Sequence, residues 1–196
     1  MGGEVVERRD AAESRRRILA AARRLFGECG VDAVSMHEVG RAAGVGQGTL
    51  YRRFGHKGDL CAALLGEEIE VLMREVQARE ESELALERLG WLLDRISVFN
   101  EENGALLGGM RNAGDEERRV EMYRNPFYAW LRATVRGMLD RAVEEDEISG
   151  LDAEHIADVL LAALNIDLYF YQRRELGMDR ERIVASLNQL LDGLRA

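Results

Sequence analysis

Proline is nearly absent from this 196-residue sequence, because Pro126 is the only one. Aromatic residues make up only 6% of the chain. No stretch alternates apolar and polar residues as a half-buried strand does. Hydrophobic residues nevertheless make up 46% of the chain, which is long enough to bury a core. The sequence therefore predicts an all-α protein.

Cysteine is also scarce, with only Cys29 and Cys61 present. The N-terminus is charged rather than apolar, and no uncharged apolar run approaches the length of a membrane span. We therefore expect a cytoplasmic protein with reduced thiols and no membrane partner. Both cysteines are expected to be small half-buried residues, with a redox switch at Cys61 as the alternative.

Residues suited to catalysis or to metal binding are few. The three histidines, His37, His56 and His155, have no metal-ligand spacing, and neither cysteine lies in a CxxC pair. The string GVGQG lacks the preceding strand that a dinucleotide-binding fingerprint requires. The sequence thus predicts no enzyme, no catalytic residue, no metal and no cofactor.

The stretch from Ser35 to Lys57 has the pattern of two short helices joined by a tight turn. Ser35 and Glu38 form a capping box at the start of the first helix. Gly44 and Gly46 break that helix, and Gly46 can begin the next one. The second helix leaves polar and basic side chains on its outer surface, which is the plan of a helix-turn-helix.

The same stretch resembles the DNA-binding signature of the TetR family of bacterial transcriptional regulators. The resemblance implies a helix-turn-helix domain of three helices at residues 1–57. It also implies a helical ligand-binding and dimerisation domain at residues 58–196, with about nine helices in all. The matching motif is Gly44-Val45-x-x-Gly48-Thr49-Leu50-Tyr51-x-x-Phe54-x-x-Lys57.

The net charge of −9 is divided unevenly along the chain. Residues 1–57 hold 11 basic and 7 acidic side chains, a net charge of +4, whereas residues 58–196 hold 16 basic and 29 acidic ones, a net charge of −13. The positive field therefore lies at the end where a helix would meet phosphates.

The predicted DNA contacts lie on the second helix of the motif and its exit. Hydroxyl and ammonium groups in this set suit phosphates, which fix the register of the protein on the duplex. The glutamine and the two arginines suit base edges, with a phosphate contact as the alternative for each arginine. The set is Gln47, Gly48, Thr49, Tyr51, Arg52, Arg53 and Lys57.

Helical spacing of apolar residues predicts further helices on either side of the motif. Residues 1–12 are expected to form a loose arm, with Arg15, Arg16 and Arg17 just beyond it, where the family has an early backbone contact. One helix is expected to end near residue 99, before a short, weakly helical segment that Asn103-Gly104 and Gly108-Gly109 bracket, and residues 111–119 are expected to form a loop or a frayed turn. The other helices are expected at residues 14–28, 57–80, 82–99, 126–143, 153–171 (capped by Asp152) and 180–194.

The segment 156–171 is apolar almost all round, and such a helix must be covered on every side. We therefore predict a homodimer in which the last two helices form half of a four-helix bundle. Its two helix-turn-helix units would read a palindromic operator in double-stranded DNA. The predicted interface residues are Leu160, Leu164, Leu187 and Leu191.

Large, adaptable apolar side chains are abundant after residue 58, and a few polar tips lie among them. Such a mixture is typical of a small-molecule pocket, although plain helical core is the alternative for each residue. We expect an apolar or aromatic effector, and the acidic charge of residues 58–196 favours a cation over an anion. The predicted lining is Met73, Trp91, Phe99, Met110, Tyr123, Phe127, Trp130, Met138, Asn165 and Tyr169.

Taken together, these features predict a bacterial, sequence-specific DNA-binding transcriptional regulator. We expect a dimeric repressor that a small ligand releases from its operator. The alternative is a DNA-binding or adaptor protein of the same fold that has no inducer and acts through protein partners.

Overall fold

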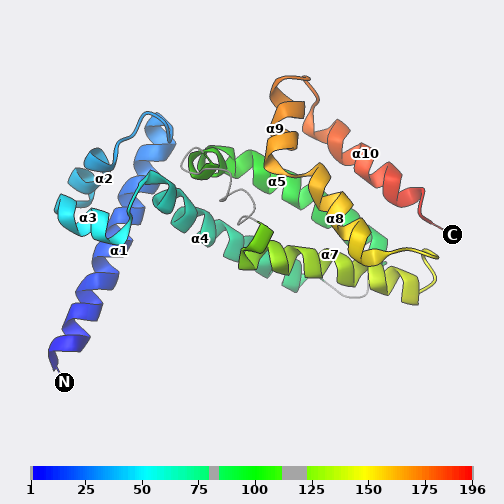
Figure 1. Ribbon diagram of the computed structural model, residues 1–196, viewed down its shortest axis with the longest axis horizontal. Coiled ribbons are helices and arrows are strands. Elements are labelled where there is room, and N and C mark those ends of the chain that lie inside the picture. Colours follow the sequence, from blue (N-terminus) through cyan, green and yellow to red (C-terminus); the bar gives the residue numbers. More distant parts are fainter. Residues whose placement is uncertain (1, 80–83, 112–122, 196) are drawn as a thin grey trace. The chain divides into compact units, whose positions relative to one another are not determined.

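The computed structural model describes residues 2–79, 84–111 and 123–195, which form nine α-helices (Figure 1). The only β contact in this part of the chain is an isolated bridge between Ile148 and Arg195. The prediction of an all-α protein is therefore confirmed. None of the helices described is both long enough and apolar enough to cross a membrane.

The chain divides into two compact units. The N-terminal unit comprises Met1–Val71 and Asn103–Arg119, and the C-terminal unit comprises Leu72–Glu102 and Val120–Ala196. The predicted functional boundary after residue 57 stays a prediction. The compact unit that holds the helix-turn-helix extends further, to Val71.

The N-terminal unit contains three complete helices, α1 (Gly2–Cys29), α2 (Met36–Ala43) and α3 (Gln47–Arg53). It also contains the first part of α4 (Lys57–Ala78) and the last part of α5 (Ala85–Arg111). The expected loose arm at residues 1–12 is wrong, because α1 is one helix from Gly2 onward. Its apolar stripe packs with α2, α3 and α4 around a core that includes Ile18, Ala22, Phe26, Val39, Leu50, Phe54, Leu60 and Leu64.

The local signals of the helix-turn-helix are confirmed. The Ser35 amide donates to Glu38 Oε2 at 2.8 Å, and the Glu38 amide donates to Ser35 Oγ at 3.3 Å, so the capping box is complete. Gly44 ends α2 with a φ of 64°, a left-handed conformation that a glycine adopts without a steric penalty. Gly46 begins α3, as the sequence predicts.

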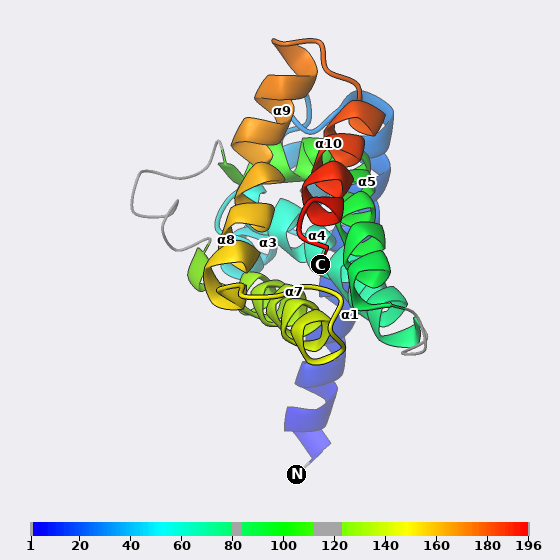
Figure 2. The same ribbon diagram turned by 90° about the vertical axis from the view of Figure 1, so that its right-hand side faces the viewer.

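The C-terminal unit contains the rest of α4 and α5 together with α7 (Pro126–Glu144), α8 (Ala153–Ala163), α9 (Ile166–Arg174) and α10 (Arg180–Asp192). Figure 2 shows α9 rising to a loop and α10 returning from it. Short polar side chains cap the N-termini of α7, α8, α9 and α10, and Pro126 follows the first cap at position N1. These caps are Asn125, Asp152, Asn165 and Asp179.

Two predicted helix boundaries are wrong. The expected single helix from residue 153 to 171 is broken, because Asn165 caps α9 by accepting a hydrogen bond from the Asp167 amide at 3.0 Å. Conversely, α5 runs without interruption through Asn103, Gly104 and Gly108, where an end was expected. The predicted loop at 111–119 lies outside the described residues from position 112 onward.

A polar network ties α9 and α10 to α5 in the C-terminal unit. The Tyr169 hydroxyl donates to Glu101 at 2.8 Å, and the Arg173 guanidinium donates to the same carboxylate. Burial alone would raise the pKa of Glu101, but the hydrogen bonds from Arg173 and Tyr169 lower it, so the group is a carboxylate near neutral pH. Arg180 in turn binds Asp94 of α5.

Close packing explains why α5 has a glycine at position 109, inside the helix. A Cβ at this position would lie 2.8 Å from Cys61 Sγ and 2.8 Å from Val31 Cγ1, closer than packed atoms allow. At Gly108 the same Cβ would meet nothing within 4 Å. Gly109 therefore allows close packing in the N-terminal unit, and Gly108 has no such role.

This contrast predicts opposite effects of two neighbouring substitutions. We expect Gly109→Ala to lower the free energy of unfolding by about 1–3 kcal/mol, the usual result of overpacking a core. Gly108→Ala should raise it by up to about 1 kcal/mol, because alanine favours the helix. Urea unfolding of both variants measures the difference. Equal stability of the two variants would contradict the close approach to Cys61.

Candidate DNA-binding surface and ligand groove

The outer face of α3 is set by the residues that it buries. Leu50 has no exposed surface and Phe54 is 4% exposed, so both belong to the core. Gly48, Tyr51 and Arg52 are exposed. Because Tyr51 and Arg52 follow Gly48 by three and four positions, all three lie on the opposite face of α3. This face holds three residues of the predicted DNA-contact set, whose contacts with DNA stay a prediction.

The remaining polar residues of α3 lie at the edges of that face. Gln47 is half-buried, and its amide donates to the His37 carbonyl of α2 at 3.4 Å. The side chain also lies against Gly40, where an added Cβ would be 2.7 Å from Gln47 Nε2. Thr49 is likewise half-buried. The Gln47 side chain therefore lies at the crossing of α2 and α3. It would have to leave its hydrogen bond to His37 to make the predicted base contact with its amide nitrogen.

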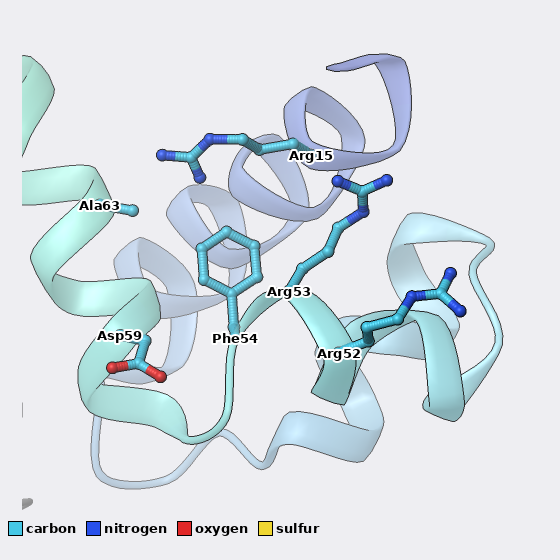
Figure 3. A pocket seen from close by; sticks show the side chains of 6 residues that line it. All are labelled: Arg15, Arg52, Arg53, Phe54, Asp59 and Ala63. Atoms are coloured by element: carbon cyan, nitrogen blue, oxygen red, sulfur yellow. The ribbon is translucent and has the colours of Figure 1, made fainter. Parts of the chain in front are cut away.

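A cavity of about 450 Å³ lies beside α3 and is called here the arginine pocket (Figure 3). The Arg15 guanidinium of α1 lies over the Phe54 ring, 5.2 Å from its centroid. Arg52 and Arg53 leave α3 in different directions. The pocket is lined by Arg15, Arg52, Arg53, Phe54, Asp59 and Ala63.

Arg53 has an unusual environment within this pocket. Its Nε atom is buried and has no hydrogen-bond partner among the described residues. A buried donor without a partner costs about 1–3 kcal/mol. The terminal Nη groups of a guanidinium are the donors that suit a phosphate oxygen.

The arginines of the N-terminal unit differ in how far their charge is already balanced. Arg16 pairs with Glu13 at 2.8 Å, Arg24 pairs with Glu28 at 3.0 Å, and Arg23 pairs with both Glu67 and Glu68. By contrast, the arginines that line the arginine pocket make no ion pair with any residue that the structure describes. Three arginines without an ion pair to a described residue therefore lie together beside α3, with Asp59 as the one carboxylate in the pocket lining.

Lys57, the only lysine in the sequence, binds the loop that connects α1 to α2. Its ammonium donates to the carbonyl oxygens of Val31 at 2.7 Å, Asp32 at 3.2 Å and Val34 at 3.1 Å. The three donors of the ammonium are thus matched by three acceptors. The predicted phosphate contact of Lys57 stays a prediction, but the structure gives this side chain a capping role that the sequence did not reveal.

The comparisons with known proteins agree with this geometry. Residues 18–64 match the model of the family described as bacterial regulatory proteins, tetR family. An HTH-type transcriptional regulator of Staphylococcus aureus strain MRSA252 is 31% identical over 166 residues, which cover 84% of this chain and 85% of that relative. The chain belongs to the TetR family. It is a transcriptional regulator with a helix-turn-helix DNA-binding domain, and its relatives are regulators rather than enzymes, as the sequence predicts.

Other matches to this TetR-family chain are partial in length or in identity. A regulator of Staphylococcus aureus strain USA300 is 34% identical over 125 residues, and the match spans 63% of this chain and 66% of that relative, just under two thirds. A TetR-family regulator of Pectobacterium atrosepticum, solved by crystallography, has a TM-score of 0.70 at 22% identity. That match covers 96% of this chain and 97% of the other, and it confirms the fold.

A groove of about 320 Å³ lies in the C-terminal unit and is called here the α4–α5–α7 groove. Trp130 and Met138 of the predicted pocket line it. The Trp130 ring stacks on Phe127 with the ring centroids 5.9 Å apart, which fixes its orientation. The full lining is Val76, Gln77, Ala85, Arg88, Trp130, Thr134, Gly137, Met138 and Arg141.

The other residues of the predicted pocket have varied environments. Tyr169 has no exposed surface and donates to Glu101, so it belongs to the core. Asn165 was expected inside a helix, but it caps α9 and donates to the Tyr123 hydroxyl at 3.0 Å. Phe99 packs 6.1 Å from Phe127, between ring centroids. Met73 and Trp91 are half-buried, and Met110 and Tyr123 are exposed.

The leucines predicted for the dimer interface are buried within their own chain. Leu160, Leu164, Leu187 and Leu191 are between 3% and 5% exposed. They have little surface to offer a partner. The exposed large apolar side chains of the same helices are Val159 on α8, 47% exposed, and Leu190 on α10, 61% exposed.

The two cysteines differ in environment. Cys61 has no exposed surface, and burial raises the pKa of its thiol to about 11, so it stays protonated and unreactive near neutral pH. Cys29 is exposed. Among the described residues, no group of three histidine, cysteine or acidic side chains is placed to hold a metal ion.

The capping role of Lys57 predicts a loss of stability. Lys57→Met removes the ammonium that donates hydrogen bonds to three loop carbonyl oxygens. We therefore expect the free energy of unfolding to fall by about 1–3 kcal/mol. Arg41→Met, at an exposed position of α2, serves as the control and should change it by no more than about 0.5 kcal/mol. Urea unfolding measures both. A Lys57→Met variant as stable as the control would leave the lysine without a structural role.

Proposed function

We propose that this TetR-family regulator is a repressor that binds a palindromic operator as a homodimer and leaves it when a small molecule binds. The observation that carries the proposal is the exposed face of α3, flanked by arginines that make no ion pair with a described residue. Selection of bound fragments from random duplex DNA tests it. We expect an inverted repeat with half-sites about 34–36 Å apart or a multiple of this distance.

On this proposal the two adjacent arginines of α3 have different roles. Arg52 is exposed on the groove-facing side and reads a base edge, for which guanine O6 and N7 are the best partners. Arg53 and Arg15 line the arginine pocket and together bind the DNA backbone. The cation–π contact with Phe54 holds Arg15 in place for that contact.

The division of roles predicts two kinds of binding defect. Arg52→Ala should reduce the preference for the selected operator over a scrambled duplex, at a cost of about 1–3 kcal/mol. Arg53→Ala and Arg15→Ala should weaken binding to both duplexes alike, and each should lower the salt slope by about one. Fluorescence anisotropy at several salt concentrations measures both quantities.

Arg24→Ala is the matched control for these variants, because Arg24 is already paired with Glu28 on α1. It should change neither the preference nor the salt slope. If Arg53→Ala reduces the preference and Arg52→Ala does not, the two roles are assigned the wrong way round.

The proposed dimer uses the outer surfaces of α8 and α10. A helix that is apolar on its inner face needs no further apolar residue outside, yet Val159 and Leu190 are both about half exposed or more. Ala162, one turn from Val159, is also exposed and small enough to let another helix approach closely. These surfaces replace the four buried leucines as the candidate contacts with a second copy.

This assignment predicts the effect of a charge on either helix. Leu190→Glu should convert the protein to a monomer at micromolar concentration, because an unpaired carboxylate would be buried in the interface. Val143→Glu alters a side chain of α7 that is 37% exposed and should leave the dimer intact. Sedimentation velocity separates the two states. A dimeric Leu190→Glu variant would place the interface elsewhere.

Release by a ligand is supported by the continuity of α4. This helix begins at Lys57, directly after α3, and reaches Val76 and Gln77, which line the α4–α5–α7 groove. A ligand in the groove can therefore favour one position of α4. It shifts the DNA-binding equilibrium only by its differential affinity for the two states, and DNA must weaken ligand binding by the same factor.

A further inference from the structure

We infer that the α4–α5–α7 groove binds an organic monoanion, a carboxylate with an aromatic or aliphatic body, through Arg88. The inference deepens the ligand release proposed above and depends on it for its biological role. It assigns the site to one groove and gives the chemical class of the ligand. Four aspects of the groove support it: its size, its apolar wall, its charge and the open position at Gly137.

The size and wall of the groove suit a small amphiphilic molecule. Its volume of about 320 Å³ is at the lower end of the range for small-molecule sites, about 300–1,000 Å³. Val76, Trp130 and Met138 supply the apolar surface. The Trp130 ring is held by Phe127 and offers a flat face on which the body of a ligand can pack.

The charge that the groove offers comes from Arg88. Two arginines line the groove, Arg88 from α5 and Arg141 from α7. Arg141 donates to Glu145 at 2.7 Å, so its charge is already balanced. Arg88 makes no ion pair with any described residue, and its Nε atom is buried without a hydrogen-bond partner. One uncompensated positive charge matches one negative charge on the ligand.

The start of α5, beside the groove, already binds a carboxylate of the protein itself. Glu147 receives hydrogen bonds from the Ala85 amide at 2.6 Å and the Leu86 amide at 3.3 Å, at the start of α5. The positive end of α5 is therefore already satisfied. An incoming carboxylate is left with the guanidinium of Arg88, one turn further along the helix, which can bind it through two parallel hydrogen bonds.

Gly137 provides a way to fill the groove without changing its charge. It lines the groove, and a Cβ built on it would meet no atom within 4 Å. A larger side chain at this position therefore occupies the space of the ligand while leaving the packing of α7 intact. Arg136, its neighbour, pairs with Asp140 at 3.4 Å and is not among the lining residues, which makes it a matched control for Arg88.

The test is a pair of probes that differ only in charge, 4-phenylbutyrate and 4-phenylbutyramide. Binding to the DNA-free protein is followed by fluorescence in a Trp91→Phe background, where Trp130 is the only tryptophan. We expect the carboxylate to bind about tenfold more tightly than the amide, because the amide carries no charge and can accept only one of the two parallel hydrogen bonds from Arg88. Arg88→Gln should abolish this preference, and Arg136→Gln should preserve it.

Gly137→Leu should weaken binding of both probes, which locates the site independently of charge. Thermal melting of each variant verifies that the fold is retained. Equal affinity for the carboxylate and the amide in the wild-type groove overturns the inference, as does wild-type binding by Gly137→Leu. Because the titration contains no DNA, neither result affects the proposed operator binding. If operator DNA leaves the affinity of a bound carboxylate unchanged, the site stands and the proposed release fails.

Discussion

The burial of Leu50 and Phe54 in the N-terminal core is the interaction on which the DNA-binding surface depends. With seven residues, α3 is too short to be stable in isolation, so its packing determines both its existence and its rotation. Once these two side chains are inside, Gly48, Tyr51 and Arg52 must point outward. The Phe54 ring also supports Arg15 from α1, so the same contact arranges the positive charge beside the exposed face.

Features encoded by neighbouring residues were predictable from the sequence. The capping box at Ser35, the turn at Gly44 and the cap at Asn125 depend on residues within four positions of each other. The helix-turn-helix followed from the first two of them, and the all-α fold followed from the lack of an alternating strand pattern. The signature that resembles the TetR family has the same local character, which is why it identified the family without any knowledge of the tertiary structure.

Features that depend on distant contacts were not predictable in this way. Gly109 looked like a helix end, but Cys61 and Val31 make it a packing position. Asn165 looked like a polar tip in a pocket, but it ends one helix and begins another. The leucines at 160 and 187 were correctly expected to be buried, but their own chain covers them, and the period of a helix does not reveal which chain does so. The net charge of residues 58–196 describes a whole domain, whereas the lining of a single groove, here with two arginines, depends on the tertiary structure.

The attachment of Lys57 to the loop after α1 has a chemical consequence. As the only lysine in the sequence, it carries the single ε-amine of the molecule, and that amine is already surrounded by three carbonyl oxygens. Acetylation there would remove the positive charge and leave a single N–H donor where three carbonyl oxygens now accept. All lysine-directed modification of this protein is therefore concentrated at one point, and its target is the link between α4 and the loop that leads into the helix-turn-helix.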